Sequence, residues 1–339
     1  MPRPSLRLLS RDNGVGLSRD LRLLADVAAS VGLFAHAVDL PADRDDCMKR
    51  EARLWRDRLL HGRVDLQVFS ERVYRRCLPL ARCNVLIPNP EWLLDKWRPL
   101  LPRFDLILCK THHAQRIFEA LGCPTHYIGF TSDDRLDTTV PRQRAFFHLA
   151  GASSLKGTQV LMETWARHPE WPRLTVVQSP RVANATVRAD NIEHRVGYLD
   201  DGELRHLQNA HRFHVCPSET EGFGHYLMEG LSVGAVVLAT DAQPMNELVD
   251  ATRGVPIRAH AAGPLRLAHR HAVSPESIED AVQLALELSA LQCEDLGIAA
   301  RQFFQRHRRM FLSRMRATFE GLLKPAGMPL APGDAAWPP

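Results

Sequence analysis

The chain has 339 residues, of which 45% are hydrophobic and 24% charged, and its formal net charge is +4. This is an ordinary globular balance, and at roughly 100–200 residues per domain the length suggests two domains. The charge is too small to indicate nucleic-acid binding by itself. The seven cysteines include no CxxC pair and no ligand spacing with histidine, so we expect reduced thiols and no metal site.

The N-terminus lacks the long apolar core and small-residue cleavage pattern of a signal peptide. No apolar run approaches the ~20 residues that a membrane-spanning helix needs. From these features we expect a cytoplasmic protein, at most peripheral on the inner face of the membrane.

Short apolar runs indicate strands in the first half of the chain, at 6–10, 33–39, 64–69, 83–88, 104–109 and 124–129. Amphipathic stretches typical of helices lie between them, at 17–30, 44–60, 71–81, 91–100 and 112–121. This alternation predicts an α/β domain with a parallel sheet covered by helices. We assign residues 1–140 to this N-terminal Rossmann-like domain.

Residues 130–144 are polar and aperiodic, which indicates an interdomain linker. A second series predicts another Rossmann-like domain over 145–294, with strands at 145–150, 173–178, 192–196, 212–216 and 235–239. Its expected helices lie at 156–167, 201–210, 225–233, 244–249 and 275–290. An amphipathic helix over 295–324 is expected to pack back toward the N-terminal domain, and a tail over 325–339, rich in Pro, Ala and Gly, to be disordered.

The most informative segment runs from His214 to Thr240. An apolar strand ends there in Pro-Ser, a turn with two glycines follows, and a helix begins near His225. Glycines let the backbone approach a ligand closely, and a helix start presents unpaired N–H groups. Together they form an anion site suited to a diphosphate, at the strand end where open α/β sheets bind ligands.

Two glutamates flank this helix start. Glu221 lies on the loop and Glu229 on the helix, so one carboxylate is suited to the hydroxyls of a sugar and the other to those of a ribose. The alternative is that two glutamates eight residues apart occur by chance, on an ordinary capped connection between strand and helix.

These residues resemble a known family. Pro217-Ser218, Glu221-Gly222-Phe223-Gly224 and then Glu229 are similar to the donor motif of retaining glycosyltransferases of family 4, also called group 1. Gly151–Gly157, with Lys156, resembles the phosphate loop of that family, and Gly197–Leu204 resembles the segment that closes around the nucleobase. The resemblance is good over roughly 145–290 and loose in the N-terminal half. It implies the GT-B fold, in which two Rossmann-like domains face a central cleft.

The resemblance also implies roles for single residues. Glu221 and Lys156 would be catalytic, Glu221 orienting the transferred sugar and Lys156 binding the diphosphate. The implied donor-binding residues are Ser218, Gly222, Phe223, Gly224, His225, Glu229, Tyr198 and Ser154. The family carries a second basic residue shortly before the lysine, whereas this chain has Ala152, Ser153 and Ser154 there. The serine hydroxyls or Arg181 are candidates to replace it.

Candidate residues on the acceptor side of the cleft lie in the N-terminal half. Gly14 and Gly16 belong to a loop that resembles the glycine-rich loop of the family, although a plain tight turn is an equal alternative. Asn89 and Glu91 follow one predicted strand, and Lys110 to His113 follow the next. Helix N-capping by Asn89 or Thr111 is the alternative for these positions.

The implied reaction moves a sugar from a nucleoside-diphosphate sugar to a glycan, lipid-linked or other hydroxyl acceptor, with retention and with no cofactor or metal. A sugar-nucleotide epimerase of the same fold and a non-catalytic sugar-nucleotide-binding protein are the alternatives. Basic clusters at 49–58 and 301–316 indicate solvated helix faces or contact with an anionic membrane. We do not expect nucleic acid as a partner.

Overall fold

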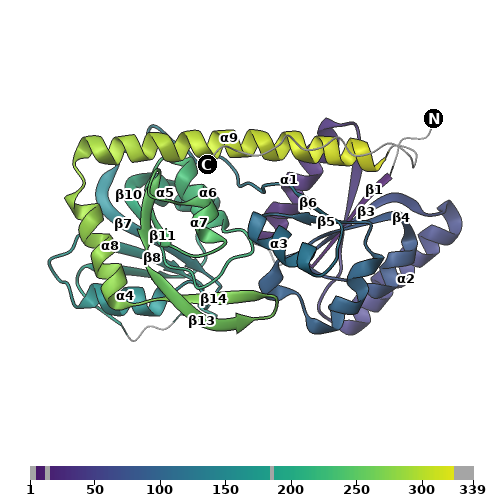
Figure 1. Ribbon diagram of the computed structural model, residues 1–339, viewed down its shortest axis with the longest axis horizontal. Coiled ribbons are helices and arrows are strands. Elements are labelled where there is room, and N and C mark those ends of the chain that lie inside the picture. Colours follow the sequence, from purple (N-terminus) through teal and green to yellow (C-terminus); the bar gives the residue numbers. More distant parts are fainter. Residues whose placement is uncertain (1–4, 12–15, 184–186, 324–339) are drawn as a thin grey trace. The chain divides into compact units, whose positions relative to one another are not determined.

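The computed structural model describes residues 5–11, 16–183 and 187–323. The chain divides into two compact units, which are described separately (Figure 1). Unit 1 comprises Met1–Phe130 and Arg309–Pro339, and unit 2 comprises Thr131–Arg308. Within the described ranges, none of the helices combines the length and the apolar character required to cross a bilayer.

Unit 1 contains a six-stranded parallel sheet, as the alternating pattern predicts. Its strands are β1 (Ser5–Ser10), β2 (Phe34–Asp39), β3 (Val64–Ser70), β4 (Ala81–Ile87), β5 (Leu106–Cys109) and β6 (Thr125–Tyr127), in the order β2-β1-β3-β4-β5-β6. The connecting α-helices are α1 (Gly16–Ser30), α2 (Arg44–His61) and α3 (His112–Ala120). Phe69 and Phe104 pack edge to face at 5.1 Å in its core.

Two helices predicted for unit 1 are wrong in type. The predicted helix at 71–81 is the short 3-10 helix η1 (Arg75–Leu80), and β4 begins directly after it. The predicted helix at 91–100 is replaced by the 3-10 helices η2 (Pro90–Trp92) and η3 (Asp95–Arg103). Prolines inside η1 and η3 lack the N–H that an α-helix needs, which favours the shorter 3-10 turns.

Unit 2 contains a second parallel sheet of six strands. These are β7 (Gln143–Gly151), β8 (Leu174–Gln178), β9 (Ile192–Val196), β10 (His211–Cys216), β11 (Val236–Thr240) and β12 (Gly254–Ile257), in the order β12-β11-β10-β7-β8-β9. Its helices are α4 (Thr158–Ala166), α5 (Asp201–Ala210), α6 (His225–Ser232), α7 (Met245–Leu248) and α8 (Pro275–Glu287). The winding reverses between β7 and β10, and ligands of such sheets bind at this point.

The core of unit 2 is built on aromatic side chains. Phe146 on β7 and Phe213 on β10 stack with their ring centroids 4.6 Å apart, and Trp165 on α4 packs edge-on against Phe146 at 4.8 Å. All three side chains are fully buried. This packing fixes β7 and β10, the strands on either side of the reversal, against α4.

The sequence predicts no strand between 240 and 275, and the structure contains three. β12 completes the sheet, and β13 (Ala259–Leu265) pairs antiparallel with β14 (Ala268–Val273) in a separate hairpin. β12 begins at Gly254, where a side chain would not fit because a Cβ would lie 2.4 Å from the carbonyl oxygen of Val237 on the neighbouring strand. Histidines, arginines and Gly-Pro interrupt the apolar alternation that normally identifies a strand.

The expected linker and the last helix also differ from the prediction. The linker was expected to reach residue 144, but β7 already begins at Gln143. The last helix, α9 (Ala290–Leu322), begins five residues before the predicted start at 295. In unit 1 Phe311 of α9 packs edge-on against Phe130 at 5.0 Å. The tail over 325–339 lies outside the described residues.

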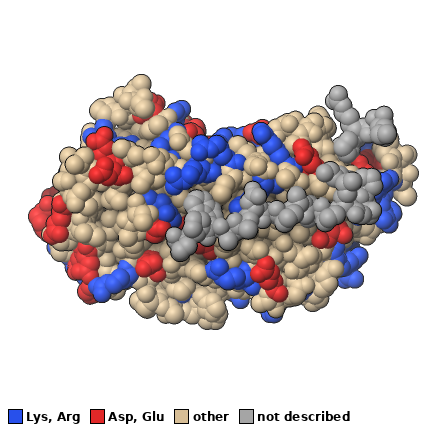
Figure 2. Space-filling model, turned by 45° about the horizontal axis from the view of Figure 1, so that its top comes forward, with Lys and Arg blue, Asp and Glu red and all other residues tan. Residues whose placement is uncertain are grey.

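Many of the basic side chains of α9 are engaged within their own units. Arg301 and Arg308 bind Asp134 and the backbone of Ser132 in unit 2, while Arg316 donates to Ser30 at 2.9 Å in unit 1. On the face drawn in Figure 2, Lys and Arg side chains lie among Asp and Glu side chains. These three arginines therefore serve as hydrogen-bond donors within their own units.

Candidate functional site

Two loops of unit 2 meet where the winding of the sheet reverses. One loop follows β7 and leads into α4, and the other follows β10 and leads into α6. Glu219 donates its backbone N–H to the carbonyl of Leu155 at 2.9 Å. Gly157 has φ +63°, and a Cβ there would lie 2.2 Å from the carbonyl oxygen of Pro217. Only glycine allows this close approach, so the sequence itself brings the two loops together.

The meeting point holds an ion pair between Lys156 and Glu221. Lys156 Nζ contacts Glu221 Oε1, and the two side chains are only 16% and 12% exposed. Ser218 donates to the same carboxylate oxygen at 2.6 Å. The structure thus gathers three residues that the sequence singles out for a donor site.

Tyr226, which the sequence analysis does not single out, completes this cluster. Its hydroxyl hydrogen-bonds to Ser218 Oγ, and Lys156 Nζ lies 3.7 Å from the centroid of its ring. Burial raises the pKa of Tyr226 well above its ordinary value, so the phenol stays protonated. Burial likewise raises the pKa of the neighbouring Cys216 thiol, which makes that cysteine unreactive.

The loop after β10 ends in a glycine turn that leads into α6. Gly224 has φ +96° and lies directly before His225, the first residue of α6. Phe223 is buried, and its ring packs edge-on against His225 at 5.4 Å. His225 Nδ1 lies 2.7 Å from the hydroxyl of Ser132, 93 residues upstream. Gly222 is buried in the same turn.

Glu229 belongs to a different polar network from Glu221. It is 1% exposed, and its Oε2 accepts a hydrogen bond from Gln208 Nε2 at 2.6 Å. Glu221 instead contacts Lys156. The two glutamates, eight residues apart, therefore have different partners.

The remaining residues expected to bind the donor lie on the surface of unit 2. Tyr198 is 83% exposed, and Ser154 and Arg181 are also exposed. Ser153 Oγ accepts a hydrogen bond from the backbone N–H of Leu155 at 3.2 Å, which stabilises its own loop. Among the described residues, no contact singles out a replacement for the second basic residue.

Candidate residues of unit 1 lie at the ends of β4 and β5. Asn89 and Glu91 are both buried, and Asn89 Nδ2 donates to Glu71 Oε1. Asn89 makes no helix cap, so that alternative is wrong, whereas Thr111 does cap α3 by accepting from the N–H of Ala114 at 3.0 Å. Gly16 is the first residue of α1, and Gly14 lies outside the described residues.

A buried ion pair lies beside these residues. Lys110 Nζ and Asp20 Oδ2 are 2.6 Å apart, with 3% and 4% of their side chains exposed. Burial acts to lower the pKa of Lys110, but Asp20 and Glu71 outweigh it and raise the pKa above its ordinary value. Lys110 therefore stays charged. Asp20 is 90 residues away in the sequence, and no local pattern predicts this pairing.

A comparison with protein families finds one match, which falls on part of unit 2. Residues 189–303 match the family described as glycosyl transferases group 1. The matched segment lies within unit 2. It contains the turn after β10 and both glutamates. A search of curated proteins found no match to the chain.

Several solved structures share the fold. A sucrose-phosphate synthase from Thermosynechococcus elongatus superposes with a TM-score of 0.74 at 14% identity, over 94% of this chain and 99% of that one. A glycosyltransferase from Rickettsia africae gives 0.69 at 11% identity, over 96% and 100%. Anabaena HepE in complex with UDP and glucose gives 0.67 at 13% identity, over 95% and 99%. The fold is therefore GT-B, built from two Rossmann-like units.

Proposed function

We propose that the protein is a glycosyltransferase that moves a sugar from a nucleoside-diphosphate sugar to a hydroxyl acceptor with retention of configuration. The observation that carries the proposal is the pairing of Lys156 with Glu221 where the loops after β7 and β10 meet. The family match over 189–303 and the complex of Anabaena HepE with UDP and glucose support a donor of this class.

Lys156 is the proposed partner of the leaving diphosphate. When the bond between the anomeric carbon and the phosphate oxygen breaks, negative charge builds on the diphosphate. Lys156 and the backbone N–H groups at the start of α6 would stabilise that charge, and one such donor contributes about 3 kcal/mol to the transition state. We propose that these groups supply the positive charge without a metal or other cofactor.

Glu221 is the proposed partner of the transferred sugar. Its carboxylate would accept hydrogen bonds from sugar hydroxyls and stabilise the positive charge that develops on the ring. The acceptor oxygen would then form its bond to the anomeric carbon on the face that the diphosphate leaves. Its proton would pass to a leaving phosphate oxygen, so that the configuration is retained and no nucleophile of the protein is required.

The nucleoside would lie toward Glu229 and the segment before α5. We assign the ribose hydroxyls to Glu229 and the nucleobase to the segment that carries Tyr198. Because Glu229 is 1% exposed, the ribose can reach its carboxylate only if the covering groups move. Tyr198, at 83% exposure, is free to fold over a flat ring.

Unit 1 is the proposed source of the contacts to the acceptor. Asn89 Oδ1 and Ser70 Oγ are buried and have no hydrogen-bond partner in the described part of the chain. Buried polar atoms are nearly always satisfied, so these two are suited to the hydroxyls of a glycan, lipid-linked or other acceptor. Neither atom identifies the acceptor further.

The proposal is tested by incubating the full chain with UDP-, GDP- and ADP-sugars and candidate hydroxyl acceptors, and following anomeric protons by NMR. A glycosyltransferase of this kind yields free nucleoside diphosphate and a product with the anomeric configuration of the donor. An inverted product contradicts retention. An epimerised sugar without acceptor, or binding without turnover, favours the epimerase or the binding protein.

A further inference from the structure

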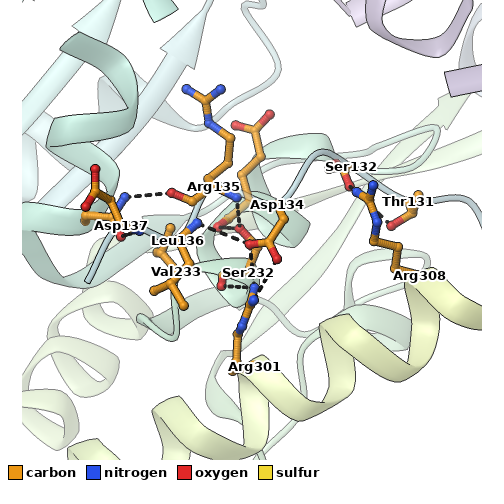
Figure 3. A network of polar contacts seen from close by, with 12 residues as sticks. Thr131, Ser132, Asp134, Arg135, Leu136, Asp137, Ser232, Val233, Arg301 and Arg308 are labelled. Carbon is orange, nitrogen blue, oxygen red and sulfur yellow. Dashed lines mark hydrogen bonds and ion pairs between the residues drawn. The ribbon is translucent and has the colours of Figure 1, made fainter. Parts of the chain in front are cut away.

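The segment Thr131–Asp137 has no regular secondary structure, yet it is bonded at many points to the rest of unit 2 (Figure 3). The guanidinium of Arg301 donates to both carboxylate oxygens of Asp134, at 2.5 and 2.6 Å. The backbone N–H of Arg135 donates to Ser232 Oγ at 3.1 Å. A polar segment that the sequence presents as a linker is therefore held rigidly, and with it the side chain of Arg135.

The side chain of Arg135 binds α5 at both ends. The residue is 6% exposed. Its Nε donates to Gln208 Oε1 at 2.9 Å, while Nη1 and Nη2 donate to the carboxylate and the backbone carbonyl of Asp201 at 2.7 and 3.0 Å. Gln208 lies late in α5, and Asp201 is the first residue of that helix.

The hydrogen bond from Arg135 to Gln208 determines how Glu229 is held. An arginine only donates hydrogen bonds, so the amide oxygen of Gln208 faces Arg135 and its NH₂ group faces Glu229. The distance from Gln208 Nε2 to Glu229 Oε2 is 2.6 Å, and both residues are 1% exposed. Glu229 accepts this bond, which fixes one orientation of its carboxylate.

The hydrogen bonds from Arg135 to Asp201 hold the start of α5. Asp200 caps this helix by accepting from the N–H of Glu203 at 2.8 Å, and Asp201 follows it in the chain. Arg135 binds both the side chain and the backbone of Asp201. It thereby fixes the point at which the proposed nucleobase segment enters the helix.

We propose that Arg135 is a positioning residue for the nucleoside of the donor. Through Gln208 it holds the carboxylate of Glu229 for the ribose, and through Asp201 it holds the start of α5 for the nucleobase. Arg135 does not itself contact the nucleotide. The inference rests on the proposed function, because it assumes that a nucleoside diphosphate binds in unit 2.

The test is a calorimetric titration of the full chain with UDP, GDP and ADP, with their 2′-deoxy counterparts, and with inorganic pyrophosphate. The wild type should bind the preferred ribonucleotide more tightly than its deoxy form. In Arg135→Met we expect the affinity for that ribonucleotide to fall about tenfold, the effect of losing one hydrogen bond to a charged group. The preference for ribose should disappear, while pyrophosphate binding stays unchanged.

Arg142 provides a matched control from the same stretch of chain. It donates to the backbone carbonyls of Asn209, Val233 and Gly234 at 3.2, 2.5 and 2.7 Å. Arg142→Met should lower stability but keep the preference for ribose. Gln208→Met removes the hydrogen bonds to Arg135 and Glu229 but leaves the pair of Arg135 with Asp201 intact. This variant should also lose the preference for ribose, and it replaces Arg135→Met in the test if that variant does not fold.

The outcomes separate the two proposals. A folded Arg135→Met or Gln208→Met protein that keeps the wild-type preference for ribose overturns the positioning role and leaves the donor site in place. A wild type that binds no nucleoside diphosphate contradicts the proposed function, and the positioning role is then withdrawn with it. Equal losses in the Arg135 and Arg142 variants also overturn the inference, since they indicate a general loss of structure.

Discussion

Lys156 and Glu221 form an ion pair across two loops, although they lie 65 residues apart in the sequence. Ser218 donates to the same oxygen of Glu221, and the ring of Tyr226 lies below the ammonium group of Lys156. A phosphate that binds Lys156 must compete with this carboxylate. The pair holds both charged side chains in place.

Replacing Lys156 by alanine should weaken the binding of pyrophosphate and of the preferred nucleoside diphosphate by about 10- to 100-fold, because a charge-assisted hydrogen bond is lost. Calorimetric titration measures this loss. Lys49→Ala is the control, since Lys49 forms an ion pair of unit 1 in which its side chain is 68% exposed. If pyrophosphate binds the Lys156 variant as tightly as the wild type, Lys156 does not belong to the phosphate site.

Two glycines of the same loop allow a matched comparison. In Gly157→Ala the new Cβ would lie 2.2 Å from the carbonyl oxygen of Pro217, whereas in Gly151→Ala no atom lies within 4 Å. Both have positive φ, +63° and +57°, so both substitutions carry a backbone cost of about 1–2 kcal/mol. Urea unfolding should show a further loss of about 2 kcal/mol or more in Gly157→Ala alone. Equal losses would mean that the two loops do not meet at Pro217.

The free energy of unfolding should depend on pH because two histidines, His148 and His214, are buried. Burial lowers the pKa of His148 to about 4 and that of His214 to about 3, from an ordinary value near 6.5. Between pH 6.5 and 4 the unfolded chain binds protons that the folded protein does not bind. The free energy of unfolding should therefore fall as pH falls through this range, by up to about 1.4 kcal/mol per pH unit for each imidazole.

Urea unfolding of the wild type and of His148→Gln between pH 5 and 6.5 measures this dependence. His148 Nδ1 lies 2.7 Å from the carbonyl oxygen of Val215, and Nε2 lies 2.9 Å from Thr158 Oγ1, contacts that a glutamine amide partly reproduces. The variant should lose about half of the pH slope contributed by the two histidines. An unchanged slope would show that His148 titrates alike in the folded and unfolded chains.

The last part of α9 should be essential to the core of unit 1. Phe311 is fully buried and packs against Phe130, so Phe311→Ala should cost about 3–5 kcal/mol. Leu291 lies near the start of the same helix and is 67% exposed. Leu291→Ala should therefore change the free energy of unfolding by less than about 0.5 kcal/mol. Urea unfolding measures both, and a small effect at Phe311 would argue against this packing.

Much of the fold could be predicted because its signals are local. The apolar runs of both sheets identify strands, and the glycine turn before His225 identifies a helix start, without distant contacts. The 3-10 helices carried a signal as well, since Pro79 and Pro99 interrupt the predicted α-helices. The hairpin β13–β14 had no apolar alternation to identify it.

The polar networks could not be predicted, because their partners lie far apart in the sequence. Arg135 binds Asp201 and Gln208 at separations of 66 and 73 residues, and Lys110 binds Asp20 at a separation of 90. A polar segment such as Thr131–Asp137 has the composition of a linker whether or not it is bonded to a domain. Only the fold shows that its arginine is buried.

The most direct test of the proposed role of Glu221 is the rate of sugar transfer by Glu221→Gln at saturating donor and acceptor. The variant keeps the size of the side chain and a hydrogen-bond acceptor but removes the charge that should stabilise the sugar in the transition state. We predict that the variant folds and binds the nucleoside diphosphate, while kcat falls about 10²-fold to 10³-fold. A folded variant that transfers sugar at the rate of the wild type would contradict the central claim.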